Sequence, residues 1–188
     1  MRLIYDDMGS LATSSDAFRR KIREAGIEVA VFNTVHRHVY QMYLNYRDHR
    51  KILVVDQRIA YTGGINLADE YANLYQKHGH WKDTAVRLEG PGAEAFSRFF
   101  LMMWDAVVDR PDDQDLASLK IPPPVTGAEG FVQPFEDGPH NNPDNPAEVL
   151  YRQMIGGAQR YYYITTPYLV VDDIMIDALV TCLFYTTP

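Results

Sequence analysis

The stretch from Tyr46 to Asn66, YRDHRKILVVDQRIAYTGGIN, decides how the rest of the chain is interpreted. His49 and Lys51 stand two residues apart, just before the apolar run 52–55, and Asp56 follows that run. The run is rich in β-branched residues and predicts a buried strand. Because side chains alternate along a strand, we expect His49 and Lys51 to point to the same side.

A histidine beside a lysine suits a phosphoryl group. Lys51 would neutralise non-bridging oxygens, and His49 would attack phosphorus or shuttle a proton. Gly63 and Gly64 let the backbone approach closely, and Asn66 can donate an amide to an oxygen. A histidine and a lysine alone are more often surface residues at the start of a strand. It is the fixed spacing H-x-K-x4-D-x6-G-G-x-N that favours a phosphate site.

This spacing resembles the HKD motif of the phospholipase D superfamily. Longer stretches, NYRDHRKILVVD (45–56), YTGGINLADEY (61–71) and GHWKDTAVRLEGP (79–91), resemble bacterial cardiolipin synthases. The resemblance covers roughly residues 1 to 180. It implies an α/β fold with a phospholipase D-like mixed sheet flanked by helices, in which a first repeat is nearly complete and a second is truncated.

The resemblance also implies an activity: phosphatidyl transfer, in which two phosphatidylglycerol molecules give cardiolipin and glycerol through a phosphohistidine at His49. Lys51, Asn66 and the backbone at Gly63 and Gly64 would bind the phosphoryl oxygens. The implied partners are phosphatidylglycerol or another anionic phospholipid at a membrane surface. The implied mechanism uses no cofactor and no metal.

Two acidic residues complete the candidate catalytic set. Asp83 stands at the start of the strand expected at 84–88, and the resemblance implies that it hydrogen-bonds His49 from behind. From the residues alone, an ordinary strand-end carboxylate is an equally good interpretation. Asp56 belongs to the motif but lies five residues after Lys51, on the opposite face of a regular strand, which favours a structural role.

The composition narrows the class of function. With 188 residues and 46% hydrophobic content, the chain suits one ordinary domain or slightly more. Its net charge of −7 counts against nucleic acid as the substrate. One cysteine, Cys182, excludes an internal disulfide. His36 and His38 have no cysteine or carboxylate at ligand spacing, which argues against a metal site.

No apolar run approaches the ~20 residues that a membrane helix needs, so no transmembrane segment is predicted. The resemblance places the parent enzyme at the bacterial cytoplasmic (inner) membrane. These two expectations are compatible if this chain corresponds to a catalytic region without its membrane helices.

The periodicity and the turn signals predict an ordered series of elements. A β-α-β unit at the N-terminus predicts a parallel strand pair. In chain order we expect a strand at 2–6, a helix closed by Gly26, strands at 27–32, 51–55 and 58–62, a short helix at 67–77, a strand at 84–88, a long helix after Pro91, a helix at 147–158, a strand at 161–168 and a helix from Asp172.

The resemblance divides the chain into three parts. Residues 1–108 would be the first half without its first strand and helix, 109–128 an acidic, proline-rich linker, and 129–188 the start of the second half. No second H-x-K-x4-D occurs, so we expect a truncated form in which His49 supplies half of a site. A homodimer could complete that site across a two-fold axis.

Two other functions stay open. The chain could be a phospholipase D-like phosphodiesterase that acts as a dimer, or a non-catalytic remnant that binds phospholipid headgroups. The sequence also leaves open whether the acceptor is phosphatidylglycerol, another lipid or water.

Overall fold

The computed structural model describes residues 1–10, 15–35, 46–77, 79–108, 113–138, 145–166 and 168–186. The chain divides into two compact units, Met1–Phe135 and Glu136–Pro188. The elements of the first unit are β1 (Arg2–Asp6), α1 (Asp7–Ser10), α2 (Asp16–Glu24), β2 (Glu28–Phe32), β3 (Ile52–Val55), β4 (Ile59–Gly63), β5 (Ala85–Glu89), α4 (Gly92–Val108) and α5 (Asp113–Ala117). Those of the second are α6 (Pro146–Gly156) and α7 (Asp173–Thr186).

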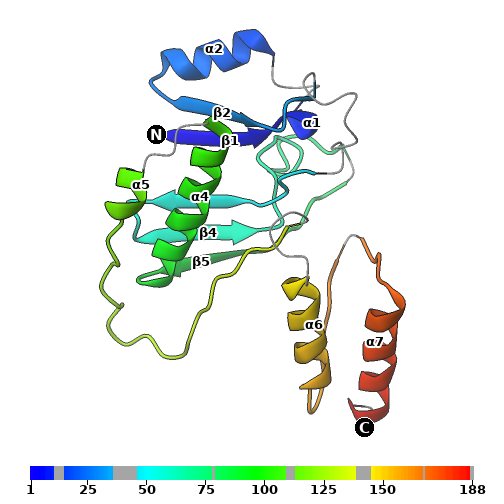
Figure 1. Ribbon diagram of the computed structural model, residues 1–188. Coiled ribbons are helices and arrows are strands. Elements are labelled where there is room, and N and C mark those ends of the chain that lie inside the picture. The colour runs from blue at the N-terminus through cyan, green and yellow to red at the C-terminus, as the bar shows by residue number, and fades with distance from the viewer. Residues whose placement is uncertain are drawn as a thin grey trace. The chain divides into compact units, whose positions relative to one another are not determined.

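The first unit begins with the predicted β-α-β unit. Strands β1 and β2 pair in parallel, with α2 between them in the chain (Figure 1). The Ser15 hydroxyl oxygen accepts a hydrogen bond from the Phe18 amide at 3.2 Å and so caps the start of α2. Gly26, at φ +81°, follows the helix in the left-handed conformation that glycine adopts readily. The parallel pair predicted from the sequence is therefore confirmed.

Strands β3, β4 and β5 form an antiparallel sheet in that order. The β3–β4 hairpin closes through Asp56 and Gln57, both with positive φ, and the Arg58 amide donates to the Val55 carbonyl at 3.1 Å. Positive φ at both central residues is typical of a type I′ turn, whose twist matches that of the flanking strands. The sequence placed these strands to within one residue.

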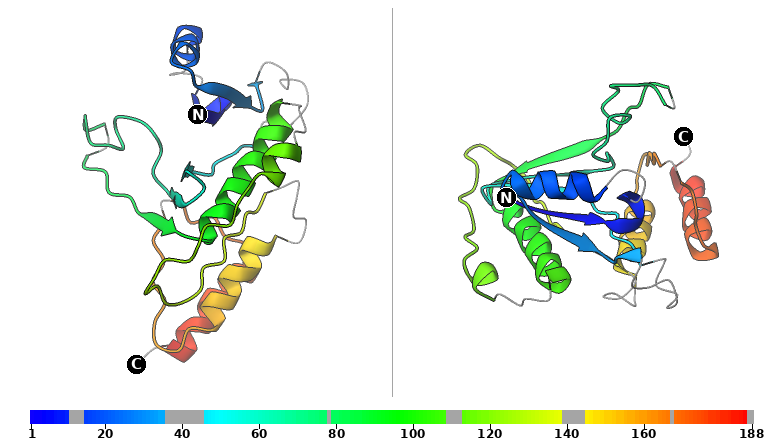
Figure 2. Two further views of the ribbon diagram at one scale, coloured as in Figure 1. Left: turned by 90° about the vertical axis from the view of Figure 1, so that its left-hand side faces the viewer. Right: turned by 90° about the horizontal axis from the view of Figure 1, so that it is seen from above.

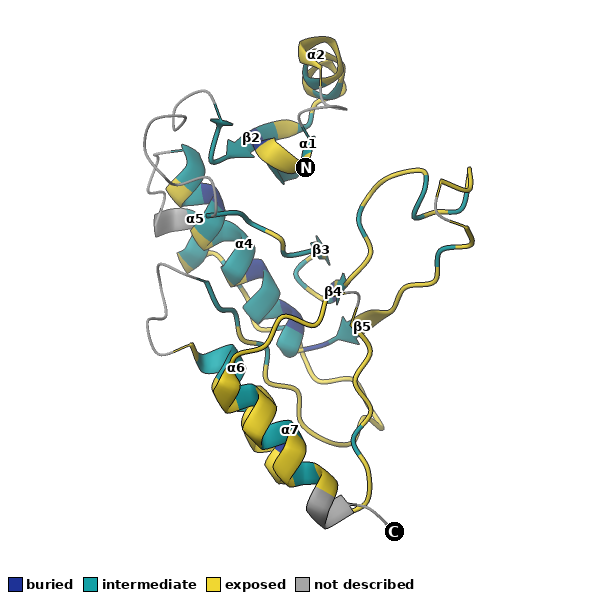
Figure 3. Ribbon diagram, turned by 90° about the vertical axis from the view of Figure 1, so that its right-hand side faces the viewer, coloured by how far each residue is buried: buried dark blue, intermediate teal, exposed yellow. Residues whose placement is uncertain are grey.

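Helix α4 packs across one face of the β3–β4–β5 sheet (Figures 1 and 2). Its buried residues are Ala93, Ser97 and Trp104. Figure 3 shows buried stretches of α4 in dark blue. Gly92 begins the helix against Leu88, where a Cβ would lie 2.6 Å from the Leu88 side chain.

The prediction of a strand at 52–55 was right, but the expectation that it is buried was wrong. Leu53 is 52% exposed and Val55 is 41% exposed, whereas Ile52 and Val54 are half-buried. The alternation follows from the helix covering one face of the sheet only.

The two sheets of the first unit are separate. Among the described residues β1 pairs only with β2, and β3 pairs with β4. A cavity of about 50 Å³ lies beside both, lined by side chains of β1, β3, α4 and the segment before β3. The lining residues are Ile4, Asp48, Arg50, Ile52, Phe99, Phe100 and Met103.

Residues 67–77 form hydrogen-bonded turns, so the predicted short helix was wrong. The Tyr71 amide donates to the Ala68 carbonyl at 3.1 Å, and the Leu74 amide donates to the Asp69 carbonyl at 3.0 Å. Asn73 adopts φ +58°, a left-handed conformation that interrupts helical geometry. Its side-chain amide instead bonds both backbone groups of Trp81, at 2.6 and 2.8 Å.

In the second unit, α6 and α7 pack against each other, and Ile155 of α6 is buried. Both helices were predicted. The strand predicted at 161–168 was wrong for the described residues of that stretch, because 161–166 pair with no strand. A segment becomes a β-strand only when it pairs with a neighbouring strand, and the sequence of the segment alone does not show whether such a neighbour exists.

The stretch predicted as a linker, 109–128, contains the short helix α5. His36 and His38 lie outside the described residues. Within the described ranges, no helix combines the length and the hydropathy that crossing a bilayer requires.

Candidate active site

One end of the three-stranded sheet gathers most of the predicted site. Because the sheet is antiparallel, the start of β3, the end of β4 and the start of β5 lie at the same end. Lys51 immediately precedes β3, Gly63 ends β4, and Asp83 lies two residues before β5. The Gly64 amide donates to the Thr84 carbonyl at 3.2 Å, which extends the β4–β5 pairing into the site.

Two side chains of the segment before β3, those of Asp48 and Arg50, line the cavity beside α4. His49 and Lys51 do not line that cavity. His49 is exposed and Lys51 is half-buried.

Lys51 is held against the backbone of its neighbour: its Nζ donates to the His49 carbonyl at 2.7 Å. Burial lowers the pKa of the Lys51 ammonium, and the carboxylates of Asp48 and Asp83 act in the opposite direction. Lys51 thus lies within electrostatic reach of Asp83, although the two are far apart in the sequence.

Asp83 is held by donors from its own segment. The Trp81 indole Nε1 donates to Oδ2 at 3.3 Å, and the Thr84 amide donates to Oδ1 at 2.7 Å. Trp81 is itself packed edge-to-face on Tyr71, with ring centroids 4.8 Å apart. The expected bond from the His49 ring to Asp83 is absent from the hydrogen bonds of the described residues.

At Gly63 and Gly64 the backbone lies very close to the start of β5 and to the segment before it. A Cβ on Gly63 would lie 2.4 Å from the Thr84 carbonyl oxygen, and a Cβ on Gly64 would lie 2.6 Å from Asp83 Oδ1. Real Cβ contacts are longer, so glycine lets β5 and the Asp83 carboxylate come this close.

Asn66 and Asp56 differ in where the structure places them. Asn66 is half-buried, two residues beyond Gly64, and in the described part of the chain its side-chain amide makes no hydrogen bond. Asp56 lies exposed in the hairpin turn, at the far end of β3 from Lys51. The structure therefore does not bring Asp56 to the other candidate residues.

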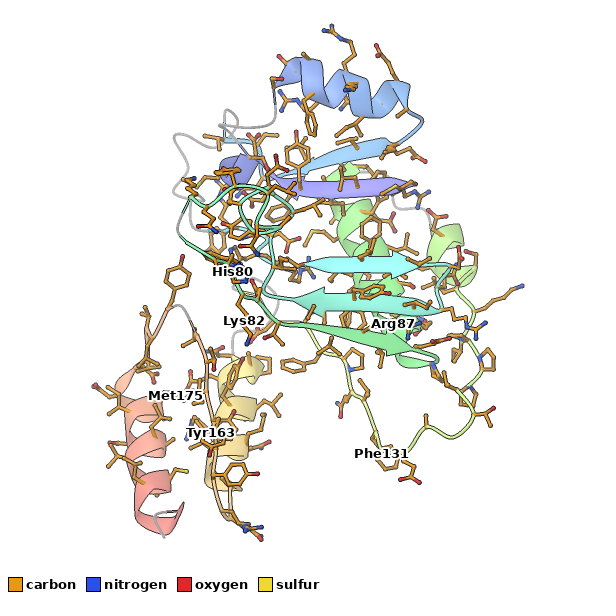
Figure 4. All side chains as sticks on the ribbon, turned by 180° about the vertical axis from the view of Figure 1, so that it is seen from behind. His80, Lys82, Arg87, Phe131, Tyr163 and Met175 are labelled. Atoms are coloured by element: carbon orange, nitrogen blue, oxygen red, sulfur yellow. The ribbon has the colours of Figure 1, made fainter. Side chains whose placement is uncertain are left out.

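Sequence reasoning missed further residues around the site. Figure 4 shows His80 and Lys82 at the same end of the sheet, on the segment that leads into β5. The signal was present in the stretch GHWKD, where both flank Trp81 and precede Asp83. Asp6 was also missed, because its link to the segment before β3 spans more than forty residues.

No cluster of three or more His, Cys, Asp or Glu side chains suited to a metal ion occurs in the described ranges. The candidate residues themselves supply an imidazole (His49), an ammonium (Lys51) and a carboxylate (Asp83).

No family model matches the chain. Among curated proteins, it is 35% identical over 189 residues to the major cardiolipin synthase of Bacillus subtilis, an alignment that covers 97% of this chain and 38% of that protein. Nearly the whole chain is homologous to one part of bacterial cardiolipin synthases.

Two further relatives match the chain over a similar range. The cardiolipin synthase of Oceanobacillus iheyensis is 32% identical over 95% of this chain and 36% of its own length. A Streptococcus mutans protein whose name states no function is 40% identical over 95% of this chain and 38% of its own length. The chain therefore spans less than two-fifths of the length of these relatives.

Proposed function

We propose that this chain carries the histidine–lysine half of the phosphatidyl-transfer site of a cardiolipin synthase. One observation carries the proposal. The Lys51 ammonium lies 2.7 Å from the His49 carbonyl oxygen, at the end of the sheet near which Asp83 also lies. The similarity to cardiolipin synthases supports the same reaction. The proposal includes a phospholipase D-like arrangement, with residues 1–108 from a first repeat, 109–128 linking the repeats and 129–188 beginning a second.

The proposed reaction begins with His49. A neutral imidazole nitrogen attacks the phosphorus of phosphatidylglycerol, a nitrogen–phosphorus bond forms, and the bond from phosphorus to the glycerol headgroup oxygen breaks. The departing oxygen takes a proton from a general acid and leaves as glycerol. A hydroxyl of a second phosphatidylglycerol then gives its proton to the conjugate base of that acid, attacks phosphorus and breaks the nitrogen–phosphorus bond, which releases His49 and gives cardiolipin.

The other candidate residues act on charge and position. Lys51 and the Asn66 amide bind the non-bridging oxygens, on which negative charge grows in the transition state. Gly63 and Gly64 allow close approach of the backbone. The proposal gives Asp83 the role of orienting His49 and stabilising its cationic form once substrate is bound, since catalytic hydrogen bonds often form only in the substrate complex. Asp56 acts through the hairpin turn and takes no part in the chemistry.

The proposed reaction also needs a general acid. The sequence holds one HKD motif, at His49, so a second motif within it does not supply this acid. In the proposed arrangement a second histidine provides it, either from a second repeat or from a second copy of this chain across a two-fold axis. The substrate is an anionic phospholipid presented at the bacterial cytoplasmic membrane.

Hydrolysis is the second candidate function, and the exposure of His49 and Asp83 favours it. Water that reaches an exposed phosphohistidine can replace the acceptor hydroxyl, and the product is then phosphatidic acid. The reaction class and the role of His49 are the same in both cases.

The test is incubation of the purified chain with phosphatidylglycerol labelled in the phosphate, in detergent micelles, with separation of cardiolipin from phosphatidic acid. We expect turnover that His49→Ala lowers by at least ~10²-fold. His80→Ala is the matched control, because it removes an imidazole from the same end of the sheet but not from the motif. Equal turnover by the wild type and His49→Ala would refute the proposal, and the ratio of products distinguishes transfer from hydrolysis.

A further inference from the structure

The segment that carries His49 and Lys51 needs an external support. Residues 46–51 belong to no helix and no strand, so ladder hydrogen bonds do not fix their course. A site that attacks phosphorus depends on accurate placing of its nucleophile, since a misplacement of about 1 Å can cost ~10²-fold in rate. The contacts that hold this segment therefore matter for catalysis.

Asp6, the last residue of β1, meets the segment directly. Its Oδ2 accepts a hydrogen bond from the Asp48 amide at 3.1 Å, and its Oδ1 lies 3.4 Å from the Arg47 guanidinium Nη1. Oδ1 also accepts from the Met8 amide at 2.9 Å, which fixes the carboxylate at the end of β1.

The Asp6–Arg47 pair is shielded from water, unlike a typical surface ion pair. The Asp6 side chain is 12% exposed and the Arg47 side chain is 16% exposed. Screening by solvent is weak at such positions, so the pair stabilises one geometry more strongly than an exposed pair does.

A second attachment comes from the end of β2. Arg47 Nη1 donates to the Asn33 carbonyl at 2.9 Å, and the Asn33 side-chain amide donates to the Tyr46 carbonyl at 2.6 Å. The segment is thus tied to β1 at Asp48 and to β2 at Tyr46 and Arg47. His49 lies between these attachments and the start of β3.

We propose that Asp6 and Arg47 are positioning residues for His49 and Lys51, an inference that rests on the proposed phosphatidyl transfer. Neither touches the phosphoryl group. They hold the backbone from which the imidazole projects, and that backbone also supplies the carbonyl that holds the Lys51 ammonium.

The test is Asp6→Asn, which keeps the size of the side chain but removes its charge and one acceptor oxygen. Amide hydrogen exchange is measured residue by residue, and kcat and KM are measured with phosphatidylglycerol in micelles. We expect exchange at Asp48 and its neighbours in 47–51 to accelerate about tenfold or more, because hydrogen bonds to charged groups are strong. Exchange in β4 and β5 should stay unchanged, and kcat should fall about 10–100-fold with KM within about twofold.

The matched control is Asp16→Asn, because Asp16 is also an aspartate paired with an arginine, Arg19, but lies exposed on α2. It should change neither exchange in 47–51 nor kcat. Arg47→Lys is the conservative second variant: it keeps the charge but not the forked geometry, and we expect a smaller loss of kcat than for Asp6→Asn.

Two results of the exchange measurement would overturn the inference. One is unchanged exchange in 47–51 of Asp6→Asn, and the other is equal acceleration throughout β4 and β5, which would show a general loss of stability. Unchanged kcat despite faster exchange would also overturn it. Absence of wild-type turnover would instead count against the proposed function, and the exchange measurement would still decide whether Asp6 holds the segment.

Discussion

Gly63 and Gly64 are adjacent residues, yet a methyl group added to each would meet different neighbours. At Gly63 the Cβ would meet backbone atoms of β5, 2.4 Å from the Thr84 carbonyl oxygen and 2.8 Å from the Ala85 Cα. At Gly64 it would meet the end of the Asp83 side chain. Backbone cannot move without breaking strand pairing, whereas a carboxylate can rotate.

We therefore predict that the two alanine variants affect different properties, stability at Gly63 and turnover at Gly64. Gly63→Ala should lower the free energy of unfolding by about 1–3 kcal/mol. Gly64→Ala should leave stability nearly unchanged but displace Asp83 and lower turnover. Chemical denaturation and the phosphatidylglycerol assay measure the two effects, with Gly9→Ala as the control because nothing lies within 4 Å of that position. Equal losses of stability in both variants would contradict this account.

The pH dependence of phosphate binding should report Lys51. Its pKa is lowered by burial, so the ammonium loses its proton at a lower pH than the usual 10.5. The cation is present below the lowered pKa and lost above it. Binding of a phosphate ester should therefore weaken on the alkaline side before pH 10.5, whereas Lys51→Arg should bind over a wider alkaline range because arginine stays charged.

The same shift has a consequence for folding. The unfolded chain holds the Lys51 proton to a higher pH than the folded chain, so stability should rise with pH through the window just below 10.5. Titration calorimetry gives the binding profile, and denaturation at several pH values gives the stability. An alkaline limb that is the same for the wild type and Lys51→Arg would show that Lys51 does not bind the phosphate.

Among the elements, the β3–β4 hairpin explains the motif aspartate. Asp56 has φ +53°, a conformation that aspartate and asparagine tolerate and β-branched residues do not. We predict that Asp56→Asn is close to neutral and that Asp56→Val lowers the free energy of unfolding by about 1–3 kcal/mol. Thermal denaturation measures both. An Asp56→Asn variant with normal stability but no turnover would contradict the structural role.

Elements with strong local signals were predicted from the sequence. The periodicity of the sequence and the closing Gly26 located α2, and short apolar runs located β1, β2 and the three strands of the antiparallel sheet. The signals that failed were those that depend on contacts elsewhere in the chain. Asn73 ends the helical tendency of 67–77 by bonding Trp81, and 161–166 have strand-forming residues but no strand beside them.

The candidate site combines local and distant signals in the same way. Spacing proposes His49, Lys51, Gly63, Gly64 and Asn66, which stay a prediction, and the antiparallel pairing brings the start of β3 and the end of β4 to one end of the sheet. Asp56 lies in a turn where its φ is positive, and the spacing of residues in the sequence does not specify that angle. The hydrogen bond from the Asp48 amide to Asp6 joins the segment before β3 to the end of β1, and only the folded structure shows it.

For the whole molecule, a site completed by a second copy of the chain predicts the turnover of mixtures of wild-type and variant chains. If two copies must each supply His49, only dimers of two wild-type chains are active. An equal mixture of wild type and His49→Ala at fixed total concentration should then retain about a quarter of the turnover after subunit exchange. A chain that acts alone would retain about a half. Turnover across a series of mixing ratios measures the difference, and sedimentation at the same concentrations reports whether dimers form.

Trapping the intermediate decides whether His49 becomes covalently bound to phosphorus. The chain is mixed with phosphatidylglycerol labelled in the phosphate and quenched in alkali, in which a phosphoramidate survives. Peptide mass spectrometry then locates the label. Label at His49 that is absent from His49→Ala is the predicted result. Turnover without label at His49, or equal labelling of the His49→Ala chain, would contradict the account.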